Sequence, residues 1–426
     1  MLFNSALSTP NSELGVSRRD LLRMGAVGLT ATCTAPWFNV LTARAATAAK
    51  AGEKTKSCIL VWLVGAPPQS LTFDIKDHSE IKAISTAASG VKISEHFGKL
   101  AKVMKDVSLL RGMRTSDSNH GSARYLMHTG FRKGQNAVTH PVLGSIVSNR
   151  LGDPNSDLPN FISVGSPSFN GFTAGHLGPK FAPIRVDDTA HGLSDLAPTG
   201  SLAEFDKKSS LLDELNTAFH TDHMAPSVQA HQVTLERANK LMHTSKTKAF
   251  DLSAEPAAVK AAYGSSKLSD QFLLARRLVE SGVKFVEIRQ GGWDVHKDTV
   301  PKTKKLSEEL DTPLAALLSD LKQRGMLDST LVIVMGEFGR NPQNGSSHFS
   351  RAWTSVLAGG GLKNGRAIGD TGKSGGTVEE RPISPGDFMA TVCKTLGIDS
   401  AKEWITPQGR PVPVVAKGST PVSELF

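Results

Sequence analysis

Three segments rich in apolar and β-branched residues, the first of them continuously apolar, are typical of strands in the middle of a parallel sheet. They are SCILVWLV (57–64), VKFVEIR (283–289) and STLVIVMG (329–336), and a glycine ends or closely follows each of them. A strand that is covered on both faces lacks the polar alternation of a half-exposed strand. We therefore predict that these segments are adjacent, central and parallel, with their carboxyl ends at one edge of the sheet. The run SVLAGG (355–360) predicts a further strand.

Helical periodicity appears between and after these strands. Apolar residues recur at helical spacing in 269–282, in DTPLAALLSDLKQRG (311–325) and in SPGDFMATVCKTLG (384–397). In the second of these segments, we expect the helix to begin at Thr312, as its N-cap, with Pro313 in the first turn. Alternating strands and helices predict the fold class, an α/β protein with a doubly wound, mostly parallel central sheet and helices on both faces.

The stretch 150–260 breaks this alternation. It begins rich in proline and glycine and continues as polar helical segments. We interpret it as a loop and helix insertion within a single α/β domain that spans residues 46–426. A chain of 426 residues, with 39% hydrophobic and 21% charged residues, is long enough to bury such a core.

The overall charge and its distribution bear on which ligands the protein binds. The formal net charge is +9, but the basic residues form no block with interleaved aromatic side chains, so we expect no nucleic-acid partner. A diffuse positive field suits an anionic ligand or an anionic surface, and it is equally compatible with solubility alone.

The first 45 residues have the order of an export signal. Arg18 and Arg19 precede a modestly apolar stretch, and Ala43-Arg44-Ala45 offers a small-residue cleavage site. We expect residues 1–45 to be a twin-arginine signal peptide, with the export machinery as a partner and a periplasmic or secreted location. The alternative is a chance arginine pair before a short helix. No later segment has about 18 uninterrupted apolar residues, so we expect no membrane span in the mature chain.

Side chains that can bind a cation follow the predicted strands. In open α/β sheets, ligands bind beyond the carboxyl ends of the strands. The candidate residues lie in GAPPQSLTFD, NHGSARYLMHTG, GGWDVH, GEFGRN and NGSSHFSRAW, and they are Ser70, Thr72, Asp74, His120, Asp294, His296, Glu337, Arg340, His348 and Arg351. Oxygen and imidazole groups on several converging loops are the ligands that a hard or borderline divalent cation needs.

Each of these positions also has a structural interpretation. An Asp-x-His pair at the end of a strand commonly satisfies the amides of a turn, so Asp294 and His296 fit an ordinary loop. Glu337 can pair with Arg340, and His128 fits a packed helical histidine. The metal interpretation depends on Asp294, Glu337 and His348 meeting at the same edge of one sheet.

A family resemblance joins these segments. The motifs GGWDVH, EFGRNP, SVLAGGGLKNGRAIGDT, TFDIK, NHGSARYLMHTG, PVLGSIV, ARRLVESGVKFVEI and the ending TLGID…GRPV resemble the domain of unknown function 1501 (DUF1501) family. The resemblance runs in order from about Ser57 to the C-terminus, and a twin-arginine leader is usual in that family. It implies a fold like that of alkaline phosphatases and sulfatases.

The family name supplies no reaction, but the alkaline-phosphatase-like fold that it implies would support one, the metal-dependent hydrolysis of a phosphate or sulfate ester. The substrate would be an anionic small molecule or polysaccharide. The implied cofactor is a divalent metal (zinc, calcium or magnesium), and the implied ligands are Asp294, His296, His348, Glu337 and Asp74. Thr72 or Ser70 would be the nucleophile. The residues implied to bind the anionic ester are Arg340, Arg351 and His120.

The chain departs from the family pattern in two loops. The family's GGPSHLDTFDPK is GAPPQSLTFDIK here, so Pro68, Gln69 and Leu71 stand where serine, histidine and aspartate are usual. The family's GRDH keeps only its first and last residues, with Ser346 and Ser347 between them. These departures are typical of a degenerate member and favour an alternative, a non-catalytic exported binding or structural protein. A third interpretation is the binding of a carbohydrate or surface partner by residues 150–260.

Overall fold

The computed structural model describes residues 57–165, 173–190, 192–193, 196, 200–222 and 226–426. The predicted signal peptide, residues 1–45, lies outside the described residues.

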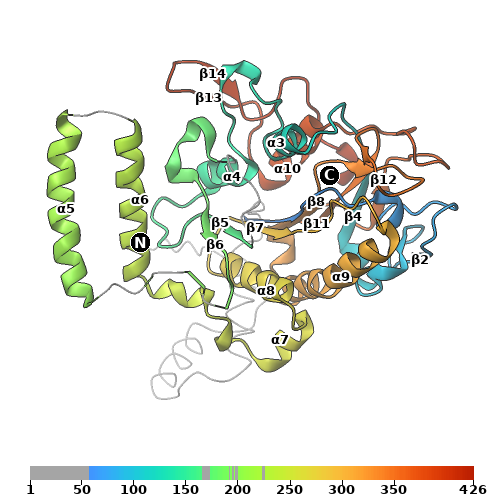
Figure 1. Ribbon diagram of the computed structural model, residues 1–426, viewed down its shortest axis with the longest axis horizontal. Coiled ribbons are helices and arrows are strands. Elements are labelled where there is room, and N and C mark those ends of the chain that lie inside the picture. The colour runs from blue at the N-terminus through green and yellow to red at the C-terminus, as the bar shows by residue number, and fades with distance from the viewer. Residues whose placement is uncertain (1–56, 166–172, 191, 194–195, 197–199, 223–225) are drawn as a thin grey trace, which may run out of the picture. The chain divides into compact units, whose positions relative to one another are not determined.

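An eight-stranded sheet forms the centre of the fold, in the order β12-β4-β11-β8-β1-β7-β5-β6 (Figure 1). Its strands are β1 (Ser57–Leu63), β4 (Val107–Met113), β5 (Phe161–Val164), β6 (Ile184–Val186), β7 (Phe285–Gln290), β8 (Thr330–Met335), β11 (Trp353–Gly359) and β12 (Arg366–Ile368). The predicted central strands are confirmed, because β1 pairs in parallel with β7 on one side and with β8 on the other. Strand β11 runs antiparallel to both of its neighbours, so the sheet is mostly parallel.

Helices cover both faces of this sheet, as the predicted fold class requires. Alternate residues of β1 point to opposite faces, and all of them are buried. Ile59 and Val61 lie in the core beneath α7 (Ala257–Tyr263), α8 (Lys267–Glu280) and α9 (Thr299–Gln323). Leu60 and Trp62 lie in the core beneath α3 (His120–Thr129), α4 (Leu143–Leu151) and α10 (Pro385–Leu396).

Helix α9 begins much earlier than predicted. It starts at Thr299, and Pro313 lies inside the helix rather than in its first turn. The buried residues of its first half include Thr303 and Ser307, so polar side chains face the core there and hide the helical periodicity. Asp311 accepts the backbone N–H groups of Lys99 and Leu100 at 2.9 and 2.7 Å, which fixes the middle of the helix against the adjoining segment.

The range predicted as an insertion also contributes to the sheet. Strands β5 and β6 both fall within 150–260 and pair in parallel with each other, and β5 pairs in parallel with β7. Outside the sheet, this range contains the long helices α5 (Leu202–Asp222) and α6 (Pro226–His243).

Short two-stranded pairs complete the described structure. They are β2 (Ala83–Ser85) with β3 (Lys92–Ser94), β9 (Gly339–Arg340) with β10 (His348–Phe349), and β13 (Glu403–Ile405) with β14 (Pro411–Pro413).

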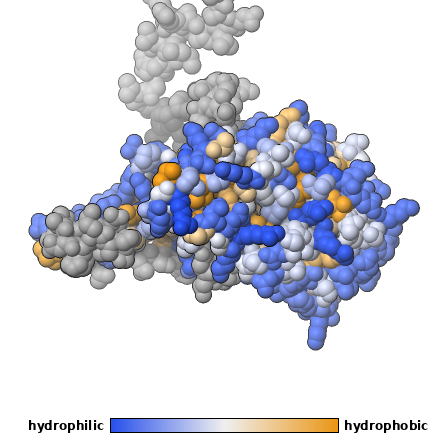
Figure 2. All heavy atoms as spheres, turned by 90° about the horizontal axis from the view of Figure 1, so that it is seen from above, coloured by the Kyte–Doolittle hydropathy of each residue, from blue (hydrophilic) through white to orange (hydrophobic). Residues whose placement is uncertain are grey.

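The face shown in Figure 2 is largely hydrophilic, with small separate hydrophobic areas. None of the helices in the described ranges combines the length and the apolar character needed to cross a bilayer.

Candidate metal centre

The loops that follow β1, β7 and β8 meet at the same edge of the sheet. The N–H of Trp293 donates to the carbonyl of Val64 at 3.1 Å, and the N–H of Gly65 donates to Oε2 of Glu337 at 3.3 Å. Gly65 has a φ of +108°, and a Cβ at this position would collide with Asp294. Glycine therefore lets the first loop approach the other two closely.

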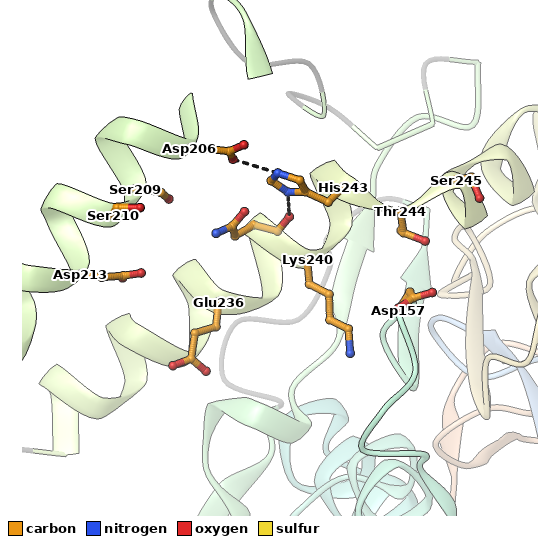
Figure 3. A pocket seen from close by; sticks show the side chains of 11 residues that line it. Asp157, Asp206, Ser209, Ser210, Asp213, Glu236, Lys240, His243, Thr244 and Ser245 are labelled. Carbon is orange, nitrogen blue, oxygen red and sulfur yellow. Dashed lines mark hydrogen bonds and ion pairs between the residues drawn. The ribbon is translucent and has the colours of Figure 1, made fainter. Parts of the chain in front are cut away.

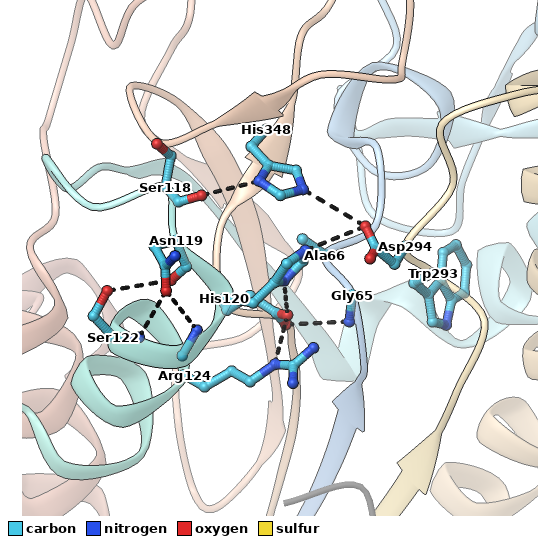
Figure 4. Close-up of polar contacts among 12 residues, drawn as sticks. Gly65, Ala66, Ser118, Asn119, His120, Ser122, Arg124, Trp293, Asp294 and His348 are labelled. Carbon is cyan, nitrogen blue, oxygen red and sulfur yellow. Dashed lines mark hydrogen bonds and ion pairs between the residues drawn. The ribbon is translucent and has the colours of Figure 1, made fainter.

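Asp294 faces three imidazole groups, and Figure 4 shows its contacts with two of them, those of His120 and His348. Its Oδ1 atom lies 3.2 Å from Nε2 of His120, 3.0 Å from Nε2 of His296 and 3.6 Å from Nε2 of His348. One ligand atom each from His120, Asp294 and His348 lies within 4.8 Å of the others. The structure thus brings together the predicted Asp294, His296 and His348, and adds His120 as a third imidazole.

Glu337 orients His120 from behind. His120 is the first residue of α3, whose N-cap Asn119 accepts hydrogen bonds from the first N–H groups of the helix. The Nδ1 atom of His120 lies 2.6 Å from Oε1 of Glu337, which also accepts a hydrogen bond from Nε of Arg124 at 2.9 Å. Burial alone would raise the pKa of Glu337, but the contacts with His120 and Arg124 outweigh it and lower that pKa. Nδ1 therefore donates to an ionised carboxylate, and Nε2 is the nitrogen that faces Asp294.

His348 is held in the same manner by a backbone carbonyl. Its Nδ1 donates to the carbonyl of Ser118 at 3.0 Å, while its Nε2 is buried without a hydrogen-bond partner. Burial and the positive charges of Arg340 and His120 lower the pKa of His348, so the neutral form is favoured. A neutral imidazole with Nδ1 as donor leaves the lone pair of Nε2 directed toward Asp294.

Arg340 binds the loops together from inside the protein. Its side chain is completely buried, and it donates to the carbonyls of Ala66 at 3.1 Å and Ser346 at 2.7 Å, with further short contacts to the carbonyl of Gly65 and to Asp294. Burial would raise the pKa of Asp294, but the bond from Arg340 and the neighbouring imidazoles hold it well below its usual range. The hydrogen-bond donors of the Arg340 guanidinium are therefore taken up by groups of the protein itself.

The first loop places its hydroxyl groups inside the protein. Thr72 is fully buried and its Oγ1 donates to the carbonyl of Pro68 at 2.8 Å, which is a turn contact. Ser70 is 1% exposed. Gln69, which replaces the family's usual histidine, pairs with the backbone of Arg340 through both ends of its amide, at 2.7 and 2.9 Å. A nucleophilic role for either hydroxyl would require this loop to move.

The remaining two predicted residues have neighbours other than Asp294. Asp74 is buried and contacts Nζ of Lys76 at 3.1 Å, Nε of Arg111 at 3.5 Å and Oγ1 of Thr371 at 2.5 Å. Its charge is therefore matched within a separate cluster. Arg351 is exposed, and its guanidinium carbon lies 4.9 Å from the centre of the Phe349 ring.

Fold and site together define a class, a doubly wound α/β protein with a candidate metal centre at the carboxyl edge of its parallel strands. The profile of the family described as "Protein of unknown function (DUF1501)" matches residues 55–426. The chain belongs to this family, and the membership predicted from its motifs is confirmed.

Comparisons with other proteins add likenesses of low similarity. No curated protein matches the chain. The lipoteichoic acid synthase LtaP from Listeria monocytogenes is 12% identical, with 82% of this chain and 73% of that chain covered and a TM-score of 0.42. The PsFucS1 sulfatase from Pseudoalteromonas sp. is 12% identical, with 85% of this chain and 72% of that chain covered and a TM-score of 0.41. A protein in the alkaline phosphatase superfamily from Vibrio parahaemolyticus is 9% identical, with 81% of this chain and 67% of that chain covered and a TM-score of 0.39. At these scores the likenesses carry no argument about activity.

Proposed function

We propose that this protein holds one zinc ion between His120, Asp294 and His348 and hydrolyses an anionic phosphate or sulfate ester outside the cytoplasm. The observation that carries the proposal is the convergence of the three ligand atoms within 4.8 Å of one another. Three protein ligands with an open position are typical of catalytic zinc sites.

The donor set supports zinc over the other two ions considered. Calcium and magnesium prefer oxygen ligands, whereas imidazole suits zinc. Ligating imidazoles usually have their second nitrogen held by a carboxylate or a carbonyl. His120 and His348 meet this condition through Glu337 and the carbonyl of Ser118. His296 contacts Asp294 from a more open position, since 52% of its side chain is exposed.

The chemistry divides between the ion and the side chains around it. A bound divalent ion supplies Lewis-acid activation of water and neutralises charge on the ester oxygens. His296 faces solvent beside Asp294, so it can carry a proton to or from the leaving group. Arg351 is the exposed guanidinium that follows His348 in sequence, and we assign it to the anionic ester group. Arg340 keeps Asp294 ionised and oriented.

A non-catalytic binding protein is the second candidate. The buried hydroxyls of Ser70 and Thr72 and the saturated guanidinium of Arg340 favour it. In that case the centre would bind zinc without turning over an ester. The two candidates share the metal and differ only in hydrolysis.

Metal analysis combined with hydrolysis assays tests the proposal. We expect the purified full chain to bind about one zinc ion and to hydrolyse p-nitrophenyl phosphate or p-nitrophenyl sulfate, with activity lost on chelation and restored by zinc. The variant His348→Ala should lose metal and activity, whereas the control His243→Ala, on α6, should keep both. Zinc binding without hydrolysis would support the second candidate, and a wild-type chain that takes up no zinc would contradict both.

A further inference from the structure

Helix α5 carries an apolar surface that the other described residues do not cover. Five large hydrophobic side chains are exposed among the described residues, and four of them lie on α5: Leu202, Leu211, Leu212 and Leu215, at 39–62% exposure. None of the α5 side chains that the structure describes, 202–216, is buried. Most helical stability in proteins comes from packing an apolar face, so an open apolar face on α5 is available for a further contact.

The opposite side of α5 is already engaged by α6. Asp206 of α5 forms an ion pair with His243 of α6 at 2.8 Å, and polar side chains line an open groove of about 780 Å³ between the two helices (Figure 3). Helix α6 is in turn fixed to the fold by Arg237, which donates to two backbone carbonyls, and by the buried Leu241. The outer side of α5 is therefore the side without a partner among the described residues.

The outer side has a charge pattern that is complementary to itself. Residues three and four apart share a helix face, so Lys207, Lys208, Leu211, Glu214 and Leu215 form one stripe. The basic pair precedes Leu211 by three and four positions, and Glu214 follows it by three. Two such helices that pack antiparallel about Leu211 bring each Lys208 against the Glu214 of the other copy. A parallel arrangement would instead bring like charges together.

We propose that α5 is the surface through which two copies of this chain form an antiparallel dimer. Symmetric dimers require a patch that is complementary to itself under a two-fold rotation, and this stripe meets that requirement. Leu211 of each copy lies at the axis, Leu215 packs against the aliphatic part of the facing Lys207, and the Lys208–Glu214 pairs border the leucines. The dimer is independent of the proposed metal centre.

Charge reversal followed by mixing provides the test. Sedimentation equilibrium of the full chain should show a dimer, and Leu211→Asp should raise its Kd at least about thirtyfold by placing carboxylates at the axis. Lys208→Glu and Glu214→Lys should each raise the Kd about tenfold, because both cross-helix pairs become repulsive. An equimolar mixture of these two variants should recover tight association, because each contact between unlike copies again joins opposite charges. Lys305→Glu, on the exposed side of α9, should change nothing.

Several outcomes would overturn the dimer. They are a wild-type chain that is monomeric at every concentration, a dimer that survives both Leu211→Asp and Leu215→Asp, and a mixture that fails to recover association. If a monomeric wild type instead binds phosphatidylglycerol vesicles and Leu211→Asp abolishes that binding, the surface belongs to lipid and the proposal is wrong. Circular dichroism melting of each variant shows whether it is folded.

Discussion

A single carboxylate oxygen, Oδ1 of Asp294, is the point on which the candidate metal centre converges. Nitrogen atoms of His120, His296 and His348 lie 3.0–3.6 Å from it, and Arg340 donates to it. One anionic atom therefore faces three imidazole nitrogens and one guanidinium. A metal ion that binds there must share Asp294 with Arg340.

Glu337 should set the affinity of the centre without touching the ion. In Glu337→Gln the partner of His120 Nδ1 loses its charge, so the imidazole becomes a poorer and less well-oriented ligand. We expect zinc affinity to fall about 10–100-fold, the usual effect of removing such a partner. Competition with a chromophoric chelator measures it. Glu309→Gln, on the exposed side of α9, is the matched control, and equal affinities for the two variants would contradict this role.

Arg340 should prove to be a stability residue rather than a substrate-binding one. Arg340→Ala leaves buried carbonyls and the Asp294 carboxylate without their donor, and we expect the free energy of unfolding to fall by about 3–5 kcal/mol. Urea denaturation measures the change. The exposed Arg351→Ala should cost less than about 0.5 kcal/mol. A stable Arg340→Ala with weakened substrate binding would restore the interpretation made from the sequence.

At this scale the sequence predicted the identity of the converging residues better than their roles. Asp294 and Glu337 follow β7 and β8, the parallel strands on either side of β1, and His348 reaches the same edge from the short β9–β10 pair. The resemblance assigned His120 to the ester, whereas its position beside Asp294, at the start of α3, makes it a metal ligand in our proposal. The use of Arg340 depends on which backbone carbonyls surround it, and no sequence pattern encodes that.

Strand β7 and helix α3 carry a buried charge cluster whose titration should lower the stability of the fold in acid. Glu287 of β7 is buried, accepts a hydrogen bond from Nε of Arg289 at 2.6 Å, and lies 3.8 Å from Nε2 of His128 of α3. Burial would raise the pKa of Glu287, but His128 and Arg289 lower it to about 2. A carboxyl group with a depressed folded-state pKa stabilises the fold above its unfolded value and loses that contribution as the pH falls.

The variant Glu287→Gln tests this coupling between the two elements. Wild type should lose stability between the ordinary pKa of 4.5 and about 2. The variant lacks this titration, so the gap in free energy of unfolding between the two proteins should be wide at pH 7 and should narrow by pH 3. Urea denaturation at both pH values measures the gap. A gap of constant width would contradict the ionised, paired state of Glu287.

The helices and strands were predictable where their apolar pattern was continuous. Strands β1, β7 and β8 agree with the prediction because both of their faces are buried. The start of α9 was missed because Thr303 and Ser307 take core positions, and because Pro313 suggested a first turn. Strands β5 and β6 were missed because they are only four and three residues long within a stretch rich in proline and glycine.

Export is a property of the whole molecule and rests on the sequence alone. Replacing both Arg18 and Arg19 by lysine should leave the protein in the cytoplasm, because the twin-arginine pair is the recognised feature of such signals. Cell fractionation followed by immunoblotting measures the distribution, with Arg44→Lys as the control. Unchanged export of the double variant would contradict the twin-arginine assignment.

The sheet and its loops together explain why ligands from distant parts of the sequence meet. His120, Asp294 and His348 are separated by more than a hundred residues in one case and by about fifty in the other, yet they meet at one edge. The order of the strands predicted the edge, whereas the side-chain orientations required the three-dimensional structure. The central claim is that this meeting point binds a metal ion.

Anomalous X-ray diffraction at the zinc edge, from crystals of the full chain grown with zinc, tests that claim most directly. We predict an anomalous peak within about 2.0–2.2 Å of Nε2 of His120, Nε2 of His348 and a carboxylate oxygen of Asp294. The peak should be absent in crystals of Asp294→Ala. A wild-type crystal with no peak at this position, or with zinc only elsewhere, such as between Asp206 and His243, would contradict the account.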